Sequence, residues 1–291
     1  MNTEVSEERL SKKYWRATNA ADLDFLTASY EPVPVNCHFH HGFTISAVEA
    51  GMLPLLVKDV RIDLRPGEIL LLGPDVPHSF DSTRVSKGCS YRTLTRTLCD
   101  PPPWFTIILT QEPNAVCRII DQTLWSVFLK RLQNAERGER DDIILLRELC
   151  RGLLSDISKN TVFKFDVRSQ SIRLAKAYLD KNFSKLPGIR ELSEVGGLSP
   201  RYFVRLFKEE LGMTPHSYLN QLRINKAKEM LGMGFSMLRI AYDLGFFDQS
   251  HFSKTFSKIT GVSPVRYLYG AQMNKTGVCL AETGEGDMRS V

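Results

Sequence analysis

Histidines gather in the first third of the chain, in the segment His38-Phe39-His40-His41 and again at His78. Side chains two positions apart on a β-strand point to the same side, so His38 and His40 can face one interior while His41 faces away. Together with His78 they could offer three imidazole ligands to a metal ion such as zinc. The alternatives are contacts to a small molecule, a structural hydrogen-bonding role, and plain surface positions.

The carboxylate that would complete such a metal site is misplaced. Glu49 lies nine residues after His40, and positions 43 to 46 are Phe, Thr, Ile and Ser. We therefore expect no bound metal and no cofactor.

A second set of polar residues surrounds two pairs of phenylalanines near the carboxyl end. Phe203 and Phe207 are four apart, as are Phe252 and Phe256, so each pair lies on one helical face and can be buried. The other faces should point outward and include side chains that hydrogen-bond base edges and phosphates. The outward residues are Arg201, Val204, Arg205 and Lys208 in the first segment and Gln249, Ser250, His251, Ser253 and Lys254 in the second.

These segments belong to an internal repeat. The first copy contains Leu192, Gly197, Phe203, Phe207, Gly212, Pro215 and Tyr218; the second contains Ile240, Gly245, Phe252, Phe256, Gly261, Pro264 and Tyr267. Each copy is typical of a helix, a glycine turn and a second helix, and Ser199 and Asp248 can cap the two second helices. The repeat predicts two helix-turn-helix units; structural helical hairpins with solvated charged faces are the alternative.

The basic residues concentrate in the same region. Residues 166–275 carry 17 lysines and arginines against 9 acidic residues, a net of +8, whereas residues 1–165 carry 20 against 21. Because phosphate neutralisation supplies most non-specific affinity for DNA, this distribution favours a DNA-binding region whose affinity falls steeply with salt.

The amino-terminal part has turn residues at the spacing expected of a small antiparallel β structure. Between residues 43 and 80, short apolar stretches alternate with turn signals such as Pro66-Gly67 and Gly73-Pro74. Two helical stripes follow, over residues 115–132 and 143–157, and Asp141 and Asp142 suit the start of the second. These helices could pack on their own domain or form a dimer interface.

The remaining segments divide the chain into domains. Residues 159–168 lack periodicity and are expected to be a linker, and a helix from Gln170 opens the next domain. The stretch from residue 271 to 291 has the composition of a disordered tail.

Composition excludes several classes of protein. The six cysteines are scattered without a Cys-x-x-Cys pair, which argues against a zinc ribbon or a disulfide framework. No apolar run approaches the length of a membrane span, and residues 1–10 do not have the pattern of a signal peptide, so we expect a cytoplasmic protein with no membrane contact. No catalytic constellation is evident, and we expect no enzyme activity.

Residues 192–269 resemble the DNA-binding domain of the AraC/XylS family of transcription regulators. The matching strings begin at Gly197-Leu-Ser-Pro-Arg-Tyr-Phe, Gly212-Met-Thr-Pro, Tyr218-Leu-Asn-Gln-Leu-Arg, Ile240-Ala-Tyr-Asp-Leu-Gly-Phe and Asp248-Gln-Ser-His-Phe. In that family one long helix joins two helix-turn-helix units, and the resemblance implies that residues 215–231 form this helix here.

The histidines and the segment Arg65-Pro-Gly-Glu-Ile-Leu-Leu-Leu-Gly-Pro-Asp-Val-Pro-His78 look like the cupin-type β-barrel that such regulators use to sense small molecules. The resemblance implies an α+β protein of two domains. An N-terminal cupin-like barrel with following helices would span residues 1–158, and an all-α domain with two helix-turn-helix units would span residues 169–270.

The expected function is that of a sequence-specific regulator that binds double-stranded DNA under the control of an unidentified small-molecule effector. His38, His40 and His78 would contact that effector. The resemblance also implies a homodimer, and a contact with RNA polymerase if the chain is an activator.

Overall fold

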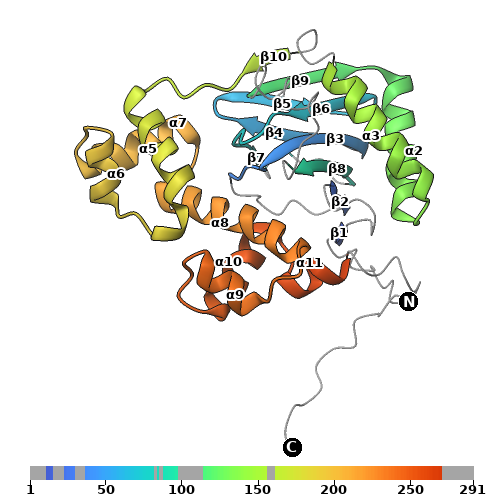
Figure 1. Ribbon diagram of the computed structural model, residues 1–291. Helices are drawn as coiled ribbons and strands as arrows, with labels where there is room; N and C mark the ends of the chain where they lie inside the picture. Colours follow the sequence, from blue (N-terminus) through green and yellow to red (C-terminus); the bar gives the residue numbers. More distant parts are fainter. Residues whose placement is uncertain are drawn as a thin grey trace, which may run out of the picture.

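The computed structural model describes residues 11–15, 23–29, 37–81, 84, 88–97, 114–155 and 161–270. A β-rich part with two helices is followed by a helical part that lies along one side of it (Figure 1). The two-domain α+β architecture expected from the sequence is confirmed. The expected tail at residues 271–291 lies outside the described residues.

Two antiparallel sheets form the amino-terminal part. The larger has the order β1-β2-β8-β3-β6-β9-β10 and the smaller the order β5-β4-β7. The strands are β1 Ser11–Trp15, β2 Leu23–Ser29, β3 Gly42–Ala50, β4 Leu53–Val57, β5 Val60–Leu64, β6 Glu68–Leu72, β7 Ser79–Phe80, β8 Ser90–Thr97, β9 Ala115–Ile120 and β10 Thr161–Lys164. Among these strands no ladder joins the two sheets, so the cupin-like unit is an open pair of sheets and not a closed barrel.

Alternation along β3 determines what each face of the larger sheet contacts. Phe43, Ile45 and Ala47 are buried beneath the helices α2 Gln122–Glu136 and α3 Arg140–Ser155. Their neighbours Thr44 and Ser46 point to the opposite face, toward the smaller sheet, because successive strand residues alternate. One face is therefore an apolar core under two helices, and the other carries hydroxyl groups.

The structure corrects two predictions about secondary structure in this part. Residues 115–120, expected to begin a helix, form strand β9 beside β6, and the helix begins only at Gln122 after the cap Asp121. Within the expected linker, Thr161–Lys164 forms β10, which pairs with β9 at the sheet edge. The chain therefore completes the sheet before it enters the helical part.

The helical part begins at the expected residue. Ser169 caps α5 by accepting a hydrogen bond from the Ile172 N–H at 3.4 Å. The helices are α5 Gln170–Asn182, the 3-10 turn η1 Phe183–Lys185, α6 Ile189–Val195, α7 Pro200–Leu211, α8 Pro215–Gly232, α9 Met237–Asp243, α10 Gln249–Thr260 and α11 Pro264–Gly270. Each repeat copy thus supplies a short helix, a turn and a longer helix, as predicted.

One apolar core crosses the boundary between the two parts. It contains Leu55 and Leu70 from the sheets together with Ile172 of α5, Phe203 of α7 and Tyr218 of α8. The second unit has its own core around Phe252 and Phe256. The first unit is therefore packed into the same core as the sheets.

Within the described ranges, no helix combines the length and hydropathy needed to cross a membrane.

Candidate functional site

The first helix-turn-helix unit consists of α6 and α7. Phe203 and Phe207 are fully buried, and the Phe207 ring lies 5.6 Å from the ring of Tyr218 on α8. Gly212 ends α7 in the left-handed conformation at φ 71°, which glycine adopts without steric cost. Ser199 occupies the N-cap position, but its side chain makes no capping hydrogen bond.

The opposite face of α7 presents three cations. Arg201, Arg205 and Lys208 are exposed, as predicted. Arg205 lies over the Tyr202 ring at 5.1 Å and pairs only weakly with Glu209, at 3.9 Å. Val204, expected to face outward, is half-buried against the core instead. Val204 follows Phe203 directly and lies three residues before Phe207, so it is about 60° around the helix from Phe207, at the edge of the apolar stripe.

The second unit repeats this arrangement with α9 and α10. Asp248 caps α10 by accepting a hydrogen bond from the His251 N–H at 2.6 Å. Gln249, Ser250, His251 and Lys254 are exposed, whereas Ser253 is half-buried. The His251 ring also lies edge-on to Phe246 at 5.5 Å, so its orientation is restrained.

Helix α8 connects the two units and is buried on nearly every side. Arg223 is 1% exposed, donates from Nε to the Phe183 carbonyl at 2.8 Å and lies 5.6 Å from the centre of the Phe246 ring. Burial lowers the pKa of Arg223 to about 10, so it remains a cation at neutral pH. Tyr218 donates to Asp180 at 2.8 Å. These contacts hold both units on one rigid helix.

The structure brings His38, His40 and His78 together. His38 and His78 exchange two backbone hydrogen bonds, of 2.9 and 2.8 Å, and their ring centres are 4.3 Å apart. The His40 ring is 5.1 Å from His38 and 5.4 Å from His78. One potential ligand atom from each of the three lies within 4.8 Å of the others.

Two of these imidazoles are shifted toward the neutral form. Burial lowers the pKa of His78 to about 4, against a smaller raising effect of its hydrogen bond to the Val76 carbonyl. Burial also lowers the pKa of His40 well below its usual value, with further contributions from the neighbouring histidines and from Lys228. Both rings are therefore uncharged at pH 7.

Two other possible metal ligands, His41 and Glu49, contact other residues instead of the three histidines. The sequence predicted this orientation for His41. His41 is exposed and pairs with Asp75 at 3.2 Å, which raises its pKa. Glu49 accepts from Arg92 at 2.7 Å and from Gln133 at 2.8 Å. Glu49 is thereby engaged with the β8 and α2 side chains rather than with the histidines.

The histidines line a cavity of about 690 Å³ between the sheets and the helical part. Its sheet side carries the hydroxyls of Thr44, Ser46, Thr93 and Thr95, which pair across β3 and β8 at 3.2 and 3.0 Å. The basic side chains that line its helical side are Lys208, His216, Lys228, His251 and Lys258. Two residues expected to face DNA, Lys208 and His251, therefore also lie on the wall of this cavity.

Sequence reasoning missed the helical wall of the cavity. Lys228 is only 8% exposed and lies 5.7 Å from the Tyr267 ring centre. The one local indication of this wall was that α8, which lies between the two repeat copies with their apolar residues, carries polar residues around its whole circumference. Which of those polar residues face the sheets depends on the packing of the two parts.

Direct contacts join the two sides of the cavity. The Phe39 ring, fully buried, lies 4.9 Å from Tyr218, and its carbonyl accepts from Asn225 at 3.4 Å. Tyr267 of α11 donates to the buried carboxylate of Asp24 at 2.8 Å.

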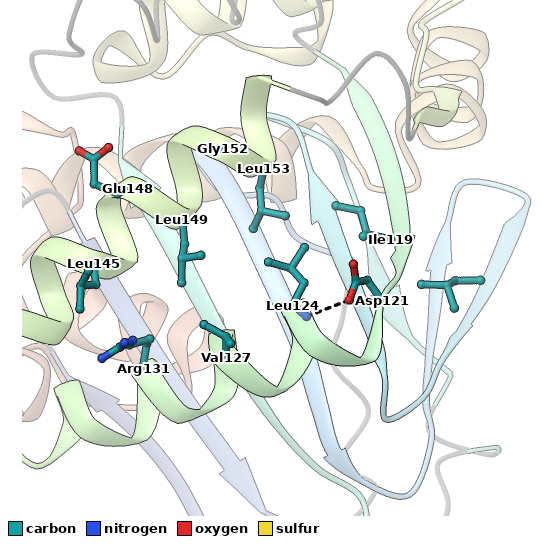
Figure 2. Close-up of a pocket in the computed structure, with 11 residues that line it drawn as sticks. Ile119, Asp121, Leu124, Val127, Arg131, Leu145, Glu148, Leu149, Gly152 and Leu153 are labelled. Carbon is teal, nitrogen blue, oxygen red and sulfur yellow. Dashed lines mark hydrogen bonds between the residues drawn. The ribbon is translucent and has the colours of Figure 1, made fainter.

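A second cavity, of about 740 Å³, lies between α2 and α3 on the far side of the larger sheet. Figure 2 shows Leu124 and Val127 of α2 facing Leu149 and Leu153 of α3 across it. Leu145, at the open edge, is 40% exposed.

Comparison with known proteins agrees with both halves of this arrangement. Residues 21–157 match the AraC-like ligand binding domain and residues 192–269 match a helix-turn-helix domain. The chain is 32% identical over 242 residues to the HTH-type transcriptional activator RhaS of Escherichia fergusonii, which covers 78% of this chain and 85% of that protein. It is 28% identical to the probable transcriptional regulator LumQ of Photobacterium leiognathi, over 80% of this chain and 91% of that protein.

The fold is also similar to that of a protein whose structure has been solved. ToxT of Vibrio cholerae O395 superposes with a TM-score of 0.53 at 17% identity, over 94% of this chain and all of that one. Another ToxT structure, with a TM-score of 0.50, contains an unsaturated fatty acid. Because RhaS is matched over most of both chains, and because the two domain matches fall on the sheet part and the helical part, this chain belongs to the AraC family of transcriptional regulators.

Proposed function

We propose that α7 and α10 read DNA in two successive major grooves, and that occupancy of the cavity between the sheets and the helices controls this binding. The observation that carries the proposal is the pair of second helices, each with a buried phenylalanine pair and an exposed polar face, on one rigid connector. Helices of this width fit the major groove, and Arg201, Arg205, Gln249, Ser250 and Lys254 offer the donors that read base edges.

Helix α8 would fix the distance between the two recognition helices. It is anchored at one end by Tyr218 and in its middle by Arg223, so the separation of the units cannot change freely. A protein with two such helices contacts one face of the duplex at points one turn, about 10 bp, apart.

Selection from random duplexes tests this arrangement without knowledge of the natural site. We expect the purified full chain to enrich two sequence blocks with centres about 10 bp apart, and to lose affinity steeply as salt rises. Enrichment of no sequence, or binding that salt does not weaken, would contradict the proposal.

The effector would bind in the cavity of about 690 Å³, a size suited to a small molecule. Its lining of hydroxyls, imidazoles and lysines favours an oxygen-rich ligand over a purely apolar one. Because the two walls belong to different domains, a ligand that bridges them stabilises one arrangement of the domains and so alters DNA affinity. A thermal-shift screen with sugars, amino acids and organic acids should identify stabilising compounds. Replacement of Thr93 by Val should then weaken the effect of any compound found.

We further propose that the chain acts in the cytoplasm as a homodimer through α2 and α3, and contacts RNA polymerase if it activates transcription. Exposed apolar side chains on and beside these helices include Ile120, Val127, Ile144 and Leu145. Burial of such a patch in a symmetric interface would remove it from water.

Sedimentation of two charged variants tests the dimer. Leu145→Glu should shift the chain toward monomer, because a carboxylate would be buried at the interface. Leu174→Glu, at a leucine 51% exposed on α5, is the matched control and should leave the sedimentation unchanged. Equal behaviour of the two variants would place any interface elsewhere.

A further inference from the structure

We propose that His38, His40 and His78 together bind one divalent transition-metal ion, with the ligand preference of zinc, at the cavity wall. The sequence argued against a metal because no carboxylate follows the histidines at the expected spacing. The three-dimensional arrangement shows that three imidazoles meet without one. The inference goes beyond the proposed function and does not depend on DNA binding.

The geometry of the three rings supports a common ion. Zinc–nitrogen bonds of about 2.0–2.1 Å in a tetrahedral site place ligand nitrogens roughly 3.4 Å apart. The ligand atoms here lie within 4.8 Å of one another, so modest rotation of the side chains brings them to an ion. The backbone needs no rearrangement, because the reciprocal hydrogen bonds of His38 and His78 already hold the two strands in register.

His78 has the supporting contact expected of a metal ligand. Its Nδ1 lies 3.0 Å from the Val76 carbonyl, an acceptor, so Nδ1 carries the proton. Nε2 then keeps its lone pair, and His78 lines the cavity. A backbone carbonyl on the second ring nitrogen commonly fixes the tautomer of zinc-bound histidine.

A fourth position would remain open to the cavity. Glu49 is held by Arg92 and Gln133 and does not complete the site. Lys228 and His40 line the same cavity. A metal ion beside an ammonium group favours an anionic fourth ligand between them, which would be hydroxide or an oxygen of the effector.

The site is linked directly to the DNA-binding part. Phe39 lies between two of the ligands in sequence, packs on Tyr218 and accepts a hydrogen bond from Asn225. An ion that holds His38 and His40 therefore restrains the segment that contacts α8. Metal occupancy should accordingly change DNA affinity as well as stability.

Metal titration of the full chain tests the site. After removal of metal with a chelator, Co²⁺ should bind with one equivalent per chain, seen by its visible absorption, and Zn²⁺ should displace it. His40→Ala and His78→Ala should each weaken binding at least about tenfold, since loss of supporting contacts alone costs that much in other sites. His41→Ala removes the adjacent exposed histidine and should leave binding unchanged.

A cysteine control and a spectroscopic measurement distinguish this site from other metal sites and from a folding defect. Cys37→Ser should retain full binding; loss of binding in this variant, or equal losses in His41→Ala and His78→Ala, would overturn the site. If a histidine variant does not fold, X-ray absorption of the zinc-loaded natural chain should show three imidazole nitrogens, and a sulfur or all-oxygen shell would refute the assignment. A chain that selects DNA but binds no Co²⁺ refutes the metal site alone. A chain that binds Co²⁺ as expected but selects no DNA, either metal-free or metal-loaded, refutes the proposed function alone.

Discussion

At the scale of single residues, Arg205 and Lys208 carry the same charge on the same helix but have different surroundings. The Arg205 guanidinium lies over the Tyr202 ring. Lys208 lies at the edge of the cavity, nearer the end of α7. The planar guanidinium can pair with guanine in two hydrogen bonds, whereas an ammonium acts as a point charge. The two side chains should therefore contribute differently to recognition.

We predict that Arg205→Ala relaxes sequence preference while Lys208→Ala weakens all sequences alike. The loss of discrimination in Arg205→Ala should be about 1–3 kcal/mol. Fluorescence anisotropy on the selected duplex and on a scrambled duplex, without effector, measures both effects. Equal losses on the two duplexes for both variants would reject the assignment of roles.

At the scale of elements, the two copies of the repeat are alike in sequence but not in how tightly they pack. Gly197 and Gly245 occupy the same turn position with φ of 64° and 71°. A Cβ at Gly197 would meet nothing within 4 Å. At Gly245 it would lie 2.5 Å from the Ser184 carbonyl oxygen and 2.9 Å from the Arg223 guanidinium. The second turn is pressed against η1 and α8, while the first is open.

We predict that alanine is tolerated much better at Gly197 than at Gly245. Both substitutions incur the left-handed backbone strain, on the order of 1 kcal/mol. Gly245→Ala should cost roughly a further 1–3 kcal/mol, because a backbone carbonyl cannot move aside as a flexible side chain can. Urea unfolding of both variants measures the difference. Similar free energies of unfolding would mean that the second turn is less tightly packed than described.

At the scale of the whole molecule, the sheets and the first helix-turn-helix unit share one core, and the second unit has another. Phe39 is the fully buried side chain that bridges the sheet part to α8. Phe43, four residues later, is equally buried but faces α2 and α3 on the far side of the sheet. Substitution of Phe39 therefore tests the coupling between the domains, whereas substitution of Phe43 tests the stability of the sheet part alone.

We predict that Phe39→Ala splits thermal unfolding into two transitions, whereas Phe43→Ala lowers stability without a split. Each substitution should cost about 3–5 kcal/mol, as is usual for a buried phenylalanine. Calorimetry records the number of transitions. In Phe39→Ala the effect of any effector on DNA affinity should also shrink, because the contact between cavity and α8 is lost. A single transition in both variants would show that other contacts suffice for coupling.

Much of the helical part was predictable because its determinants lie close together in the chain. The phenylalanine pairs four apart, the glycine turns and the cap at Asp248 each act within one or two helical turns, and a helix repeats the same local geometry wherever it is placed. Strand β9 was mistaken for helix because a short apolar run fits both the helical period of 3.6 residues and a buried strand. Strand β10 was missed because four residues at a sheet edge are too few to show an alternation of apolar and polar residues.

The sequence by itself determined the duplicated helix-turn-helix and the basic region, and it predicted that His38 and His40 lie on the same side of the chain. Only the tertiary structure decided that His78 meets them, that Glu49 is engaged elsewhere, and that Lys228 faces the same cavity. The reason is physical: periodicity is a property of neighbouring residues, whereas a cavity wall is assembled from segments far apart in the chain. The hydrogen bond from Asn225 to Phe39 spans 186 positions, and no local pattern encodes that contact.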